Sequence, residues 1–258
     1  MPRISAIHRH PVKALGSEAL ARVALEAGRT LPGDRVWALA HEKSRFDFDA
    51  PAWARCSTFL RGATFPSLMA VTAEGEAVLE GGGEITFRHP DLPPLTVDPA
   101  TPEGEAAFVA WADALIPAGA PRPARLAHAP GRGMTDQPAQ WLSVLSDASL
   151  AAVAEAAGRP MDRRRFRGNL WIEGLAPWEE TSWIGREIRL GACLLRVTEP
   201  IGRCSATHAD PETGKRDLDM LALLTGLGQA ENFGVFAEVI EGGDVAQGDL
   251  VTIPEAAA

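Results

Sequence analysis

The chain has 258 residues, of which 46% are hydrophobic and 23% are charged, a composition that excludes collagen-like, disordered and coiled-coil classes. Its net charge of −9 excludes a general attraction to nucleic acid or to anionic membranes, so an anion site must be a local basic cluster. The sequence has no apolar run long enough to span a bilayer and no signal peptide at its start, which predicts a cytoplasmic protein.

The first half of the chain is predicted to form mainly short strands, because 25 glycines and 20 prolines interrupt the whole sequence. In chain order the strands are expected at residues 35–40, 68–73 and 84–88. A helix follows over residues 101–116, with Thr101 as N-cap and Pro102 at the first helical position. The proline- and glycine-rich stretch after it indicates a domain boundary between about 95 and 130, and we divide the chain into 1–97 and 98–258.

The second half combines further strands with two helices. A helix over residues 146–158 has Ser146 as N-cap and Gly158 at its end, and a shorter one is expected at 218–224. Apolar residues alternate on both sides of Gly191, which predicts a tight hairpin over residues 185–199. The remaining strands are expected at residues 140–145, 169–173, 233–240 and 248–253.

The densest basic cluster lies between the second helix and the strand that follows it. It consists of Arg163, Arg164, Arg165 and Arg167. One or two of these guanidinium groups could bind a phosphate or another oxyanion, since their planar geometry suits it. The alternative is a solvated turn whose arginines pair with surface acids, which is the usual fate of a charge run.

The three cysteines, Cys56, Cys193 and Cys204, lack the spacing of a disulfide framework, a zinc knuckle or an iron–sulfur cluster. Cys193 is predicted to be buried in a strand. Cys204 lies on a loop beside Arg203, which favours a thiolate that could act as a nucleophile or bind a soft metal, although a packed thiol is an equal alternative. With His208 it could form half a zinc site or a Cys–His pair, but both lack further partners in the sequence.

Two weaker patterns complete the search for sites. His8 and His10 alternate on one strand and could bind a metal together, although histidines in such positions are more often structural. No glycine-rich segment has the strand, GxGxxG and helix order of a dinucleotide site, which excludes Rossmann and P-loop folds.

Several segments, taken in order, resemble a known family. HPVKALG, GDRVWAL, SVLSDASL, RFRGN, RCSATHADPETG and NFGVF are similar to motifs of the MOSC proteins, named for the C-terminal domain of molybdenum cofactor sulfurase. The resemblance covers most of the chain. It implies a β-rich α+β fold with two β-barrel-like domains, an N-terminal MOSC barrel and a MOSC barrel, and a few short helices. The two-domain relatives include the mitochondrial amidoxime reducing component.

The same resemblance implies a site. Cys204 would be the thiolate ligand of molybdenum in a molybdenum cofactor (molybdopterin), Lys13, Arg35 and Arg167 would hold the phosphate of the pterin, and Ser146 and Asn169 would be further contacts. Two departures are notable. Gly168 stands where many relatives have proline, and residues 41–62, which include Cys56, differ from the segment expected in the first domain.

The leading hypothesis is therefore a reductase of small N-hydroxylated compounds that contains molybdenum cofactor and receives electrons from a separate donor protein. Neither nucleic acid nor a membrane is an expected partner. His208 or Asp210 would supply a proton to the departing oxygen. The alternatives are a sulfur carrier or transferase with a persulfide on Cys204, and a non-catalytic carrier of the cofactor.

Overall fold

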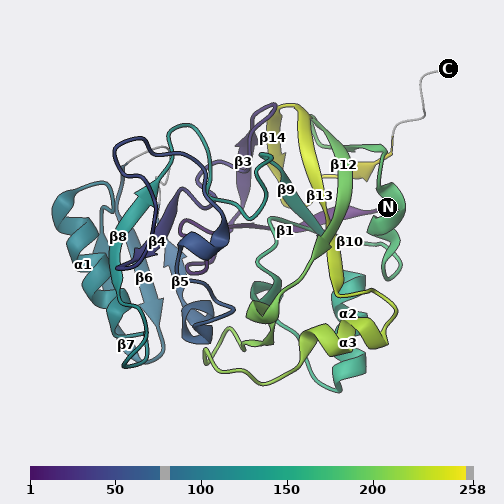
Figure 1. The fold of residues 1–258 in the computed structure, drawn as a ribbon. Coiled ribbons are helices and arrows are strands. Elements are labelled where there is room, and N and C mark those ends of the chain that lie inside the picture. The colour runs from purple at the N-terminus through teal and green to yellow at the C-terminus, as the bar shows by residue number, and fades with distance from the viewer. Residues whose placement is uncertain (76–81, 254–258) are drawn as a thin grey trace.

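A computed structural model describes residues 1–75 and 82–253 and shows a strand-rich molecule with three α-helices in the described part of the chain (Figure 1). This confirms the expected β-rich α+β class. Five short 3-10 turns connect the larger elements in the same residues: η1 (Cys56–Thr58), η2 (Pro66–Ala70), η3 (Arg163–Phe166), η4 (Glu179–Trp183) and η5 (Ser205–His208). Within these residues, the helices are all too short or too polar to cross a membrane.

The largest sheet has eight strands and curls on itself. Their order is β15 (Val251–Thr252), β11 (Glu187–Leu190), β12 (Cys193–Gly202), β13 (Asn232–Glu241), β9 (Leu142–Ser146), β10 (Leu170–Glu173), β1 (Arg3–Arg9) and β2 (Glu18–Leu20). Near its two ends, the backbone N–H of Ile4 donates to the carbonyl of Asp249 at 2.9 Å and the N–H of Gly248 donates to Ile4 at 2.8 Å. The sheet is therefore barrel-like, although its strand ladder remains open.

Smaller sheets build the other half of the molecule, on the left in Figure 1. β4 (Trp37–His41) pairs with β8 (Pro123–His128), and β6 (Ile85–His89) lies between β5 (Thr72–Glu74) and β7 (Leu92–Val97). The two-stranded sheet of β3 (Arg22–Leu25) and β14 (Gly243–Ala246) instead lies beside the large sheet, and its Leu25 and Val245 join the core of that sheet (Figure 1). The chain thus crosses between the two halves more than once.

The three helices form where the sequence predicts them. α1 (Pro102–Asp113) is capped by Thr101, whose hydroxyl accepts from the N–H of Gly104 at 3.0 Å, and it ends three residues earlier than expected. α2 (Asp147–Ala157) is capped by Ser146 and ends at Gly158 with a φ of 67°. α3 (Met220–Gly226) is the third. Local capping chemistry was sufficient to place these elements.

Most strand predictions are confirmed to within two residues, and the hairpin turns at Gly191 with a φ of 55°. Two are wrong. Residues 68–73 form the end of η2 and the start of β5, because Pro66 at the first helical position favours a turn there. Residues 248–253 contain only the two-residue strand β15.

Four buried hydrophobic clusters form the core of the described residues, and the two largest each contain residues from both sides of position 97/98. Phe108 of α1 packs against Phe87 at 4.6 Å between ring centroids, and Leu126 of β8 belongs to the same core. Ile4 and Ile7 of β1 instead join the core of the large sheet. α1 and β8 thus complete the core of the smaller sheets. After β8 the chain contributes to the core of the large sheet, to which the N-terminal strand β1 also belongs.

Candidate functional site

The two cysteines that flank β12 have opposite environments. Cys193 at its start is fully buried, donates its thiol to the carbonyl of Gly243 at 3.0 Å, and has its pKa raised to about 11, chiefly by burial. Cys204, just beyond the end of the strand, is exposed. The packed-thiol alternative therefore applies to Cys193, whereas the sulfur of Cys204 is accessible to a ligand.

The loop that carries Cys204 packs onto the first half of the molecule. The carbonyl of Cys204 accepts from the N–H and the hydroxyl of Thr207, at 3.1 and 2.9 Å, which fixes the turn η5. Further along, Arg216 donates to the carbonyl of Ala63 at 2.5 Å. Gly214, with a φ of 65°, lies so close to Ser67 that a Cβ would come within 2.7 Å of the Ser67 Cα. Cys204 consequently lies where the two halves meet.

Arg167 crosses the same interface from the second half. Its guanidinium donates to the carbonyls of Val12, Gly16 and Leu15 at 3.1, 3.2 and 3.4 Å, within the turn that carries Lys13. Its backbone has a φ of 49°, in the left-handed region that non-glycine residues seldom occupy. Burial lowers the pKa of Arg167 to about 9, with a smaller effect from the charge of Arg35.

Arg35 connects this arginine to the first half. It also has a left-handed backbone, with a φ of 53°, and its guanidinium donates to the carbonyl of Arg167 at 3.0 Å and to the carboxylate of Asp34. Asp34 is buried and its other oxygen accepts from the backbone N–H of His10 at 2.8 Å. The guanidinium of Arg35 thus links two residues with left-handed backbones, and the buried carboxylate of Asp34 fixes that guanidinium.

Lys13 and Arg203 bring two more positive charges to the region. The ammonium of Lys13 donates to the carbonyl of Met134 at 2.8 Å and to the carboxylate of Asp136 at 2.5 Å. Arg203 turns inward over Phe166 and Phe233 and donates to the carbonyls of both. Burial lowers the pKa of Arg203 to about 9; the charge of Cys204 opposes this effect and that of Arg35 adds to it. We call Lys13, Arg35, Arg167 and Arg203 the cation group.

The arginines just before this group have different partners. Arg163 pairs with Asp147 at 2.6 Å, Arg164 with Asp162 at 2.6 Å and Arg165 with Asp217 at 2.9 Å. In the described part of the chain, Arg167 and Arg203 instead contact carbonyls, which carry no compensating charge. The ion-pair alternative therefore applies to Arg163, Arg164 and Arg165, whereas among the described residues Arg167 has no carboxylate hydrogen-bond partner.

Asn169 and Ser146 do not join the cation group as free ligands. The side-chain oxygen of Asn169 accepts from the N–H and hydroxyl of Ser143, at 3.1 and 2.9 Å, and its amide donates to the carbonyl of His8 at 3.2 Å. Ser146 is fully buried and accepts from the N–H of Ser149 at 3.3 Å, at the opposite end of the β9–β10 pair. The structure gives Asn169 a positioning role and Ser146 a capping role.

The histidines do not gather into a metal site. His10 is buried between the carbonyls of Gly16 and Gly168, at 3.3 and 3.4 Å, and burial, aided by the charges of Arg167 and Arg35, lowers its pKa well below the usual value. His208 lies 3.4 Å from Asp219. Residues 1–75 and 82–253 contain no group of three His, Cys, Asp or Glu side chains arranged to hold a metal ion.

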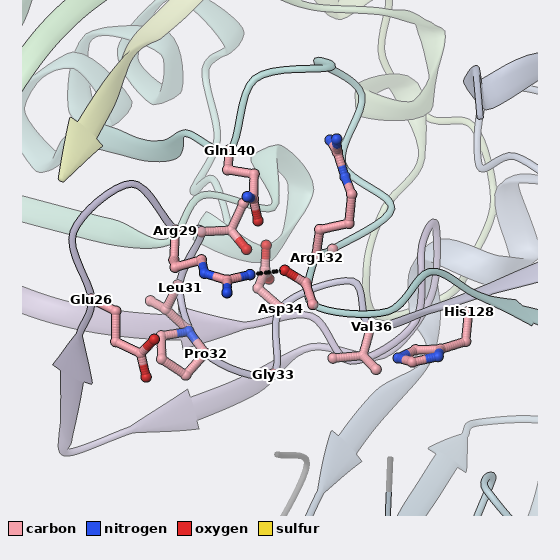
Figure 2. Close-up of a pocket in the computed structure, with 13 residues that line it drawn as sticks. Glu26, Arg29, Leu31, Pro32, Gly33, Asp34, Val36, His128, Arg132 and Gln140 are labelled. Atoms are coloured by element: carbon pink, nitrogen blue, oxygen red, sulfur yellow. Dashed lines mark hydrogen bonds between the residues drawn. The ribbon is translucent and has the colours of Figure 1, made fainter. Parts of the chain in front are cut away.

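A small cavity of about 90 Å³ adjoins the site through Asp34 (Figure 2). Arg29 donates to the carbonyl of Gly131 at its edge, Gln140 lies above it, and the guanidinium of Arg132 points away. Cys204, Lys13 and Arg167 are not among the lining residues, so this cavity is separate from the cation group.

Comparison with known proteins places the chain in a family. A model of the MOSC N-terminal beta barrel domain matches residues 1–120, and a model of the MOSC domain matches residues 132–252. The chain belongs to the MOSC family. This confirms the resemblance noted in the sequence, and β8 lies in the stretch of residues 121–131 between the two matches.

More distant likenesses accompany this match. Over 87 residues the chain is 34% identical to a molybdenum cofactor sulfurase from Anopheles gambiae; these are 33% of this chain but 11% of the relative, so the MOSC chain spans a small part of that protein. The YUAD protein from Bacillus subtilis aligns with 97% of the chain and 94% of its own, at 12% identity and a TM-score of 0.46. YiiM from Geobacillus stearothermophilus aligns with 44% and 54%, at 20% identity and a TM-score of 0.36.

Sequence reasoning found three members of the cation group and missed the two carboxylates beside them. Asp34 directly precedes Arg35 and could have been noticed as its neighbour. Asp136 is 123 residues from Lys13, and nothing local in the sequence signals that pairing. Arg203 was noted for its effect on Cys204, but not as part of the group.

Proposed function

We propose that this MOSC protein holds molybdenum cofactor, with Cys204 as the sulfur ligand, and reduces N-hydroxylated compounds with electrons from a separate donor protein. The observation that carries the proposal is an exposed thiol beside Arg203, whose half-buried guanidinium, like that of Arg167, has no carboxylate hydrogen-bond partner among the described residues. A soft thiolate suits molybdenum, and uncompensated guanidinium groups suit the cofactor's phosphate.

The residues present fit this group chemically. A buried guanidinium that contacts only neutral carbonyls is destabilised by desolvation, and an arriving phosphate would relieve that cost. Lys13, Arg35 and Arg167 would bind the phosphate, and the sulfur of Cys204 would bind the metal. The cations would therefore bind the phosphate of a large anionic cofactor, and the thiol would bind its metal.

The bound cofactor would supply the two-electron redox chemistry of the reaction. Reduction of an N–OH group to N–H consumes two electrons and two protons, breaks the N–O bond and releases water. The chain must supply or relay protons to the departing oxygen. Asp210 is committed to its turn, since its carboxylate accepts from the N–H of Glu212 at 2.7 Å, so we propose His208 as the proton donor.

The test compares the wild-type protein with Cys204→Ser and with Cys193→Ser as a matched control. Molybdenum per chain is measured by elemental analysis, and reductase activity with an amidoxime and reduced methyl viologen. We expect Cys204→Ser to lose both and Cys193→Ser to keep both. Retention of molybdenum and activity in Cys204→Ser would contradict the proposal.

A second candidate is sulfur transfer through a persulfide on Cys204, supported by the identity shared with a molybdenum cofactor sulfurase and by the exposed thiol. Mass spectrometry of protein purified without reductant separates the two candidates. A sulfur adduct on Cys204 in metal-free protein would favour transfer. Stoichiometric cofactor without turnover of N-hydroxylated compounds would favour a cofactor carrier.

A further inference from the structure

Asp136 forms an unusual pair with Lys13. The side chain of Lys13 is 6% exposed, whereas that of Asp136 is 72% exposed, although their charged atoms lie 2.5 Å apart. A buried ammonium needs a partner, because desolvation penalises its charge. Asp136 supplies that partner while most of its own side chain remains in water.

The charge of Asp136 extends beyond Lys13. Desolvation raises the pKa of Asp136, but the charge and hydrogen bond of Lys13, followed by the charges of Arg35 and Arg167, bring it below the usual value. The same carboxylate raises the pKa of Arg203. Asp136 thus contacts Lys13 directly and lies near enough to Arg35, Arg167 and Arg203 for its charge to act on them, in the region where a phosphate would be attracted.

Asp136 is also the more easily displaced of the two acids beside these cations. Asp34 is buried and fixed by the backbone N–H of His10 at 2.8 Å. Asp136 lies in residues 133–141, which form neither helix nor strand. Two residues earlier, Met134 is buried and its N–H donates to Arg35 at 2.7 Å. The backbone before Asp136 is therefore anchored, and its exposed side chain can rotate into solvent.

We propose that Asp136 is an internal counter-ion that holds Lys13 in place in the empty site and is displaced when the phosphate of the cofactor binds. The inference rests on the proposed function, in which the cation group receives that phosphate. Asp136 would compete with the phosphate for Lys13. Its carboxylate holds the buried ammonium in position and repels the incoming anion. Removing its charge without removing its hydrogen-bond acceptor should therefore tighten anion binding.

The test measures pyrophosphate binding to the full-length, cofactor-free protein by calorimetry at low salt. Asp136→Asn removes the charge and keeps an oxygen that can accept from Lys13. Glu155→Gln, on the exposed side of α2, removes the same net charge elsewhere and is the matched control. We expect Asp136→Asn to bind pyrophosphate about tenfold more tightly than the wild type and Glu155→Gln to bind within about twofold of it. Asp136→Ala repeats the comparison if the asparagine variant folds poorly.

Equal or weaker binding by Asp136→Asn would overturn the inference, since the carboxylate would then be a structural support for Lys13 or irrelevant to the anion. Absence of pyrophosphate binding in both proteins would overturn it as well. The proposed function is judged separately, by molybdenum content. Tighter binding in Asp136→Asn together with molybdenum-free wild-type preparations would support the counter-ion and contradict the cofactor.

Discussion

Two sets of arginines differ in the groups that hold them. Arg163, Arg164 and Arg165 each face a carboxylate at 2.9 Å or less. Arg167, two residues later, and Arg203 are held by backbone carbonyls. Carbonyl groups accept the hydrogen bonds of a guanidinium but do not neutralise its charge. In a protein with a net charge of −9, a half-buried cation that has no carboxylate as a hydrogen-bond partner is therefore a better sign of an anion site than a basic run alone.

The most direct way to break this comparison is to exchange one arginine from each set. Arg167→Ala should lower the affinity for the cofactor by more than about 100-fold, because two charge-assisted hydrogen bonds to a phosphate contribute about 1.5–3 kcal/mol each. Arg164→Ala should leave it within about twofold. Molybdenum content after dialysis measures the effect, with circular dichroism to verify folding. An equal loss of molybdenum in Arg167→Ala and Arg164→Ala would show that pairing with a carboxylate does not determine whether an arginine binds the cofactor.

The carboxylate-paired set should matter for stability instead. Arg165 is buried and donates to Asp217 at 2.9 and 3.1 Å and to the carbonyl of Thr207 at 3.1 Å. Arg165→Ala should lower the free energy of unfolding by about 2 kcal/mol, because it leaves Asp217 partly unpaired. Denaturant unfolding measures this, and Arg189→Ala, from an exposed pair with Glu241, should cost less than about 0.5 kcal/mol. An unchanged stability of Arg165→Ala would contradict a structural role.

A smaller effect should appear in the pH dependence of stability. His10 is neutral in the folded protein because burial and the charges of Arg167 and Arg35 lower its pKa well below 6.5, the value expected for the unfolded chain. The unfolded state therefore binds more protons below pH 6.5, and stability should fall as pH decreases, by at most about 1.4 kcal/mol per pH unit. His10→Gln should make the decline shallower, whereas His41→Gln should not. If the free energy of unfolding depends on pH with the same slope in the wild type and in His10→Gln, His10 does not cause the loss of stability at low pH.

Local chemistry explains which parts of the fold could be predicted. Thr101, Ser146 and Gly191 act through neighbours a few residues away, so their caps and turn were readable. Residues 68–73 were misassigned because Pro66 favours a helical turn over the apolar signal of a strand. The place of β1 in the core of the large sheet could not be read locally, since its partner β10 is about 160 residues distant.

The candidate site also combines features that were readable from the local sequence with features that depend on distant contacts. The sequence placed Cys204 on a loop but left a packed thiol as an equal alternative, which the structure excludes, and the resemblance to the MOSC family supplied Lys13, Arg35 and Arg167. Whether an arginine pairs with a carboxylate or with a carbonyl depends on distant contacts, such as that of Arg167 with the carbonyl of Val12, 155 residues away in sequence. Ser146 was expected at the site because a helix N-terminus attracts anions, but its hydroxyl is used within the cap. Distant pairing, rather than residue type, determined these outcomes.

The most direct test of the central claim is a crystal structure of the cofactor-loaded protein, with molybdenum located by anomalous scattering at its absorption edge. We expect the molybdenum signal at bonding distance from the sulfur of Cys204, and the phosphate among Lys13, Arg35 and Arg167. A molybdenum signal at Cys56, Cys193 or a surface site, or a phosphate bound away from these three side chains, would contradict the account.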